Sequence, residues 1–241
     1  MLRFALPMIA GNLLQQCYNL ADTFLVGRFI GSDALAAVGS SYTLMTFLTS
    51  ILLGLSMGSG AAFSIHFGAR EEERLKSSIF TSFVLILAVT VVLNVLVFVL
   101  LDPILVVLQI PASLYAMTRD YLWVIFWGIS ATFLYNFFAS LLRALGNSAT
   151  PLIFLGVSAV LNIVLDVVLI VNANMGVAGA AVATVIAQFA AGLGLLVYAL
   201  LRCPQLRLSR RHLRVTAAGL REIANLSFLT CLQQSVMDFG I

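Results

Sequence analysis

Six mostly apolar stretches of about 20 residues or more follow one another along this chain, and they constrain its fold more than any other feature. A helix of about 20 residues crosses the hydrocarbon core of a bilayer. Hydrophobic residues make up 61% of the 241 residues and charged residues only 10%, which exceeds what a soluble core requires. We therefore predict an all-α membrane protein with spans at approximately 4–27, 35–65, 77–101, 118–142, 151–171 and 176–201.

A seventh apolar segment begins near Leu220 and still continues at Ile241. A Leu-Arg pair, followed about three helical turns later by Leu-Gln-Gln, occurs within residues 2–16 and again within 220–234. Parallel repeats are typical of transporters with two similar halves, although two apolar helices can also match by chance. We expect a fragment with a six-helix lobe at 1–201, a basic loop between lobes at 202–219, and the truncated first helix of a second lobe at 220–241.

Lysine and arginine lie almost entirely at one set of span ends, since only Arg28 and Arg119 lie at the other set. Cytoplasmic connections are enriched in these residues. The pattern predicts a multi-pass protein of the cytoplasmic (inner) membrane with its N-terminus in the cytoplasm. Because Leu and Val are interspersed among the arginines of the 202–219 loop, we expect this loop to contact anionic lipid and not nucleic acid.

Asp166 is the only charged residue between Pro151 and Val171, and Asn162 stands one helical turn before it. An aspartate near the centre of a membrane helix costs roughly 2.5 to 3.5 kcal/mol, so such a residue usually faces a cavity or a partner. We interpret Asp166 as a functional residue of a transporter.

Other polar residues also follow helical spacing. Four of them form a stripe on the first span: Asn12, Gln15, Asn19 and Asp22. In the sixth span Ala180, Thr184 and Gln188 share one face. Asp22 and Asp166 both fall in the outer half of their spans, so the two acids could share one cavity. Hydrogen bonding that simply holds the helices together is the alternative interpretation for these polar side chains.

The cysteine and histidine positions give little sign of metal or catalytic chemistry. Cys17, Cys203 and Cys231 share no metal-ligand spacing. His66 and His212 both lie near cytoplasmic span ends, and the sequence contains neither an H-E-x-x-H nor a G-x-S-x-G motif. We expect no cofactor and no enzymatic activity.

Five segments together resemble the first half of multidrug and toxic compound extrusion (MATE) transporters, with bacterial DinF-like or related branches most similar. The segments are LPMIAGNLLQQCYNLADTFLVGRFIG, HFGAREEERLK, RALGNSATP, LNIVLD and GVAGAAVATVIAQ. The resemblance implies a twelve-helix transporter of two six-helix lobes that exports drugs or other organic, often cationic, compounds by alternating access. It also implies a C-terminal lobe as a partner and H⁺ or Na⁺ as the coupling ion.

The resemblance assigns roles to particular residues. It implies a coupling-cation site formed by Asp22, Asp166, Asn162, Tyr121, Ala180 and Thr184. Gln15, Asn19 and Gln188 are the expected cavity-lining residues, on the basis of their spacing. Some family members carry a further acid early in the first helix, which the stretch Leu6 to Ile9 lacks here, so a sodium site would be incomplete.

Two other classes remain as alternatives. A lipid-linked oligosaccharide or lipid flippase of the same superfamily would share the lobed fold, but we would expect cavity-facing Arg or Lys to bind pyrophosphate, and no span carries one at depth. An intramembrane enzyme is the less favoured alternative, because the sequence lacks the catalytic motifs named above.

Overall fold

The computed structural model describes residues 2–206, 215 and 217–239, and within these residues it is helical with no β-strand. The predicted all-α fold is therefore confirmed. Half of the basic loop predicted at 202–219, namely residues 207–214 and 216, lies outside the described residues. The elements are α1 (Leu2–Phe29), α2 (Ser32–Gly68), α3 (Glu72–Val99), α4 (Leu101–Val107), α5 (Ala112–Ile125), α6 (Gly128–Ala144), α7 (Ala149–Asp166), η1 (Val167–Asn172), α8 (Gly176–Arg202), η2 (Pro204–Leu206) and α9 (Ala217–Phe239).

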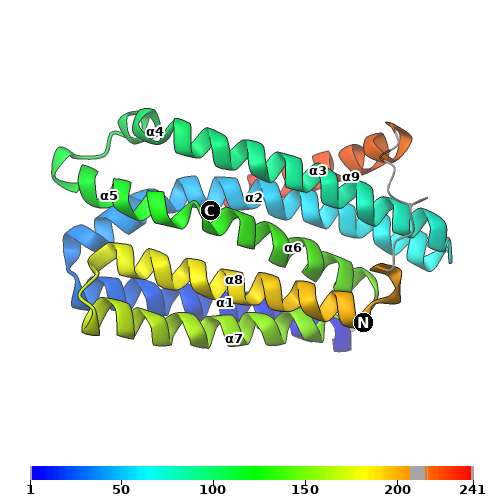
Figure 1. The fold of residues 1–241 in the computed structure, drawn as a ribbon, viewed down its shortest axis with the longest axis horizontal. Helices are drawn as coiled ribbons and strands as arrows, with labels where there is room; N and C mark the ends of the chain where they lie inside the picture. Colours follow the sequence, from blue (N-terminus) through cyan, green and yellow to red (C-terminus); the bar gives the residue numbers. More distant parts are fainter. Residues whose placement is uncertain (1, 207–214, 216, 240–241) are drawn as a thin grey trace.

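The long helices lie side by side in one bundle (Figure 1). α1, α7 and α8 form one side, α2, α3 and α9 form the other, and the α5–α6 pair runs between them. The N-terminus, the α2–α3 turn, the α6–α7 turn and the end of α8 share one end of the bundle (Figure 1). These are the connections that the sequence marks as basic, so we call this the basic end.

Each predicted span corresponds to a helix or a pair of helices, but not every one of these helices is apolar enough to be classed as a membrane span. Among the residues that the structure describes, four segments are long and apolar enough to cross a membrane: α2, α3, α8 and the continuous α7–η1. α5 and α6 together make a fifth, with a bend of 43° at their junction. α1 and α9 contain 28 and 23 residues, but their amide and charged side chains make them too polar to meet the same criterion. The protein is thus a multi-pass helical membrane protein.

Three local features depart from six uninterrupted spans. The fourth span bends where the backbone tightens, since Trp127 N–H donates to Val124 O and Ile129 N–H donates to Phe126 O, each three residues back. The fifth span ends in the π-helix η1 directly after Asp166. The short helix α4 follows α3. None of these features changes the apolar pattern, so hydrophobicity alone does not predict them.

The helix α7 has one outward apolar face and one inward polar face. Its Asn162 and Asp166 are fully buried. The side chains of α7 that remain exposed are all apolar, and most lie at helical spacing: Ala149, Ile153, Val157, Val160, Ile163 and Val164. An exposed stripe of this kind fits contact with lipid chains, whereas the opposite face carries the two polar residues into the bundle.

Phenylalanine side chains fill the contact between α2, α3 and α6. Phe83 of α3 packs against Phe133 and Phe137 of α6, with ring centroids 5.4 Å and 5.3 Å apart. Phe63 of α2 meets Phe137 edge to face at 6.0 Å. Aromatic contacts of this geometry stabilise by about 0.5 to 1.5 kcal/mol beyond burial. These contacts join α2, α3 and α6 into one packed side of the bundle.

α2 and α9 form a close antiparallel seam through small residues. A Cβ atom added to Gly58 would lie 2.4 Å from Ser227 Cα, and one added to Gly54 would lie 2.7 Å from Cys231 Cα. The hydroxyl group of Thr230 donates to Gly54 O at 2.7 Å. Gly54 and Gly58 lie four residues apart on one face of α2, and α9 packs against this face.

An ion pair ties α4 to α5 at the other end of the bundle. Arg119 Nε donates to Asp102 Oδ1 at 2.8 Å, and the Tyr115 hydroxyl group donates to the same oxygen at 3.0 Å. These bonds, that of Arg119 first, lower the pKa of Asp102 below its ordinary value. Both charged side chains of the pair are solvent-exposed, so the pair orients the connection more than it stabilises the fold.

The seam predicts different outcomes for two glycines of the same helix. We expect Gly58→Ala to lower the thermal midpoint, because its methyl group would push α9 away, and overpacking costs about 1 to 3 kcal/mol. Gly39→Ala is the matched control, since a Cβ atom there has no neighbour within 4 Å. Thermal unfolding of both purified variants checks this, and equal midpoints would contradict the seam.

Candidate functional site

The two predicted acids meet inside the bundle. Asp22 of α1 and Asp166 of α7 are close enough for their carboxyl groups to interact directly. Asp166 is fully buried. Oδ1 of each carboxyl group is buried and has no hydrogen-bond partner among the residues that the structure describes. Two ionised carboxylates in such contact repel each other, so a proton or a cation between them is the arrangement that electrostatics favours.

Asn162 links Asp166 to α8. Its amide group can be placed in two orientations that differ by exchange of oxygen and nitrogen. In one, Nδ2 donates to Thr184 Oγ1 at 3.3 Å. In the other, Nδ2 donates to Asp166 Oδ2 at 3.0 Å and Oδ1 accepts from the Thr184 backbone N–H at 3.3 Å. Hydrogen bonding favours the second, because both ends of the buried amide then have a partner.

Two tyrosines complete the polar cluster. The Tyr18 side chain interacts with Thr184 and with both carboxyl groups, and Tyr121 of α5 lies near the same two acids. Tyr121 is 8% exposed and Thr184 7% exposed. Four helices, α1, α5, α7 and α8, therefore contribute to one cluster around the acid pair.

A cavity of about 390 Å³ lies next to this cluster. Asp22 stands on its wall, whereas Asp166 and Asn162 are not among the lining residues and lie behind it. The lining residues come from α1, α2, α5, α6, α7 and α8 and include hydroxyl, amide and aromatic side chains. A ligand in the cavity would reach Asp22 first and Asp166 only through the cluster.

The structure brings most of the predicted site residues together. Asp22, Asn162, Asp166, Tyr121 and Thr184 interact within the cluster. Ala180 is buried one turn before Thr184 on α8. Gln15, Asn19 and Gln188 all line the cavity, as their spacing predicts. The side chain of Asn12, the fourth member of the predicted stripe, lies outside the described part of the chain.

Sequence reasoning missed Tyr18 and the contribution of α2. Tyr18 lies four residues before Asp22, so helical spacing already places it on the polar face of α1. On α2, Tyr42, Met45 and Thr49 line the cavity at spacings of three and four residues. Because these side chains are only moderately polar and stand in a long apolar helix, the cavity-lining face of α2 could not be recognised from the sequence.

The site has a helix irregularity at its centre. Asp166 is the last α-helical residue of α7, and the π-helix η1 begins at Val167. Beyond it, Gly179 brings α8 against the Leu169 carbonyl group, which a Cβ atom would approach at 3.3 Å. π-helical turns are frequent at functional sites because they re-aim neighbouring side chains. Among the described residues, no group of three or more His, Cys, Asp or Glu side chains could hold a metal ion.

Comparison with known proteins identifies the class. The family model MatE matches residues 7–168. The probable multidrug resistance protein YoeA of Bacillus subtilis is 35% identical over 81% of this chain and 43% of its own length. The multidrug export protein MepA of Staphylococcus aureus is 30% identical over 99% of this chain and 53% of its own length. The chain belongs to the MATE family of membrane transporters, and it spans about half the length of the curated relatives it matches.

Solved structures agree in fold. An outward-facing multidrug resistance MATE family transporter of the MOP superfamily superposes with a TM-score of 0.91 at 25% identity, covering 99% of this chain and 53% of that chain. An inward-facing conformation of such a transporter gives a TM-score of 0.85 at 25% identity, covering 93% and 51%. The described helices therefore correspond to about half of a MATE transporter.

The contact between the two acids predicts a pH-dependent stability. In sodium-free buffer we expect the thermal midpoint to fall from mildly acidic to alkaline pH, because the close carboxylates repel each other once both are ionised. Asp166→Asn removes one of the two charges and should make this slope shallower. Asp33→Asn, at an exposed acid in the first turn of α2, should keep the native slope. Equal slopes in all three proteins would show that the acid pair does not govern the effect.

Proposed function

We propose that this chain forms the first lobe of a cation-coupled antiporter that exports drugs or other organic, often cationic, compounds by alternating access. The observation that carries the proposal is the buried contact between Asp22 and Asp166, in which each carboxyl group keeps one oxygen without a hydrogen-bond partner among the described residues. A proton or Na⁺ would occupy this position. The proposal assigns transport and no chemical conversion.

The coupling step follows from the charge of the acid pair. When a proton or Na⁺ binds between the carboxylates, their repulsion is removed and α1 can pack closely against α7 and α8. When the cation leaves, repulsion favours a different packing of α1, and the differential affinity of the two packings for the cation drives the change. Asp22, Asn162, Asp166, Tyr121, Thr184 and Ala180 are the proposed cation-binding residues.

The cavity offers a place for the exported compound. Its tyrosine, methionine and amide side chains suit an organic molecule with aromatic and polar parts, and Asp22 on the wall suits a positive charge. Exchange then follows because cation and substrate both depend on the ionisation of Asp22. The named relatives, a probable multidrug resistance protein and a multidrug export protein, support substrates of this class.

We further propose the division into a lobe at 1–201, a basic loop at 202–219 and the first helix of a second lobe at 220–241. The protein would lie in the cytoplasmic (inner) membrane with the basic end in the cytoplasm.

The functional test is ion-driven efflux by the complete protein in proteoliposomes. We expect export of a fluorescent organic cation when a pH gradient or a sodium gradient is imposed, and the two gradients applied separately identify the coupling ion. Asp22→Asn and Asp166→Asn should each abolish gradient-driven export, because the pair can no longer bind and release the cation. Asp33→Asn, an exposed acid of the same chain, should transport normally. Unchanged export by Asp166→Asn would refute the proposed coupling.

The proposed orientation can be tested with single cysteines. On a background without the three native cysteines, we place one at Ala69 in the α2–α3 turn and one at Ala112 at the start of α5, both exposed positions. A membrane-impermeant maleimide added to intact cells should label Ala112→Cys and spare Ala69→Cys until the cells are opened. The reverse pattern would invert the topology.

A further inference from the structure

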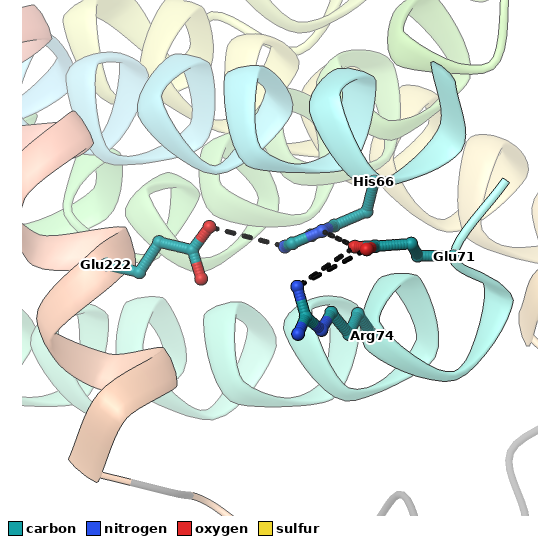
Figure 2. A network of polar contacts seen from close by, with 4 residues as sticks. All are labelled: His66, Glu71, Arg74 and Glu222. Carbon is teal, nitrogen blue, oxygen red and sulfur yellow. Dashed lines mark hydrogen bonds and ion pairs between the residues drawn. The ribbon is translucent and has the colours of Figure 1, made fainter. Parts of the chain in front are cut away.

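A second polar network lies at the basic end of the bundle, away from the acid pair (Figure 2). His66, in the last turn of α2, is 5% exposed and lies between two glutamates. Its Nδ1 is 3.2 Å from Glu71 Oε2, and its Nε2 is 3.3 Å from Glu222 Oε1. Glu71 belongs to the α2–α3 turn, whereas Glu222 belongs to α9. One imidazole ring therefore joins two segments that are far apart in the sequence.

The geometry indicates which form of the ring fits. A neutral imidazole has one N–H donor, and its other nitrogen is an acceptor that would face a carboxylate oxygen. Only the imidazolium form can donate to both glutamates. The surrounding charges agree: α2 supplies His66, the turn supplies Glu71, α3 supplies Arg74 and α9 supplies Glu222. With His66 protonated, these four groups carry two positive and two negative charges.

The two contacts of His66 differ in how firmly their partners are held. Glu71 is fixed locally, since its backbone N–H donates to His66 O at 3.0 Å and Arg74 Nη1 lies 3.3 Å from each of its carboxylate oxygens. Glu222 has a different position, in the second turn of a separate helix. A neutral ring can donate a hydrogen bond to only one carboxylate. Because Glu71 is held locally, the contact that opens when a helix moves is the one to Glu222.

Water has access to this network. A cavity of about 310 Å³ adjoins it and is lined by His66, Arg74, Ser77, Ser78, Thr81, Gly219 and Glu222. Thr81 is 1% exposed, and its hydroxyl group has no hydrogen-bond partner among the described residues. A buried hydroxyl group facing such a space is typically satisfied by water, which can also carry protons to and from the ring.

We infer that His66 is a pH-sensitive latch that holds the start of α9 against the end of α2 when the ring is protonated and releases it when the ring is neutral. Histidine commonly changes charge between about pH 5 and 8. The latch lies at one end of the α2–α9 seam, so its release would free the start of α9 while the glycine contacts further along still hold. The inference rests on the proposed function only in assigning this end to the cytoplasm and α9 to the second lobe.

Spin labels can measure the latch without any transport assay. In the complete protein with its native cysteines replaced by serine, we introduce Gly68→Cys and Ala224→Cys, both exposed positions at the two sides of the contact. The distance distribution between the labels, measured in lipid nanodiscs, should be short and narrow near pH 5 and become longer or broader toward about pH 8. An unchanged distribution over this range would overturn the latch.

Matched variants assign the response to His66. His66→Gln should abolish the pH dependence, because glutamine stays neutral, and Glu222→Gln should weaken the contact at every pH. His66→Arg should hold the labels close throughout, since a guanidinium group stays charged and can donate to two carboxylates. His212→Gln removes the other histidine of the chain and should respond as the native protein does. A native-like response in His66→Gln would refute the inference, and it would do so whether or not the protein exports a substrate.

Discussion

Asp22 and Asp166 bring two carboxyl groups into contact inside the helix bundle, and the neighbouring polar side chains gather around them. Placing an ionised carboxylate in the membrane interior costs free energy. Two carboxylates in contact cost more, because they also repel each other unless a proton or cation binds between them. Side chains of the surrounding helices bind and enclose the two acids. Asn162 ties Asp166 to α8, Tyr18 and Tyr121 enclose the pair, and the wall of the cavity gives Asp22 access to a ligand.

Away from the acid pair, two kinds of contact hold the helices together. Apolar and aromatic packing joins α2, α3 and α6, where Phe63, Phe83 and Phe137 leave little freedom. Small residues join α2 to α9, where Gly54 and Gly58 bring two backbones together. In lipid, close packing and hydrogen bonds, not the hydrophobic effect, drive helix association. α2 therefore acts as the common support for both the lobe and the helix that follows it.

The polar network at the basic end also places two carboxylates near one another, but next to a cavity that water can enter. His66 stands between two carboxylates, as a proton or cation would stand between Asp22 and Asp166. In the two proposals made above, a single positive charge holds separate helices together in each place. His66 would supply this charge from the chain itself, whereas the acid pair would take it up as a proton or Na⁺.

Much of the fold could be predicted from the sequence, because the apolar stretches are longer than any loop and match the bilayer thickness. The site could be predicted in part for a similar reason: Asn162 with Asp166, and Gln15 with Asn19 and Asp22, follow helical spacing within one segment. The bend before Gly128, the π-helix after Asp166 and the role of Tyr18 were not predicted. The first two depend on backbone hydrogen bonds that leave hydrophobicity unchanged, and tyrosine is common in membrane helices for other reasons.

The local spacing of side chains and the cost of a charge in lipid are enough to predict which segments are helices, which face of each is polar, and that Asp166 needs a partner. The structure adds the interaction of Tyr18 with the acid pair, the position of Asp166 behind the cavity wall, and the contact of His66 with Glu222 on α9. Helical spacing fixes positions on one helix, whereas contacts between helices depend on which side chains allow close approach. Gly54 and Gly58 show this for α2 and α9, because a Cβ atom at either position would meet the backbone of α9.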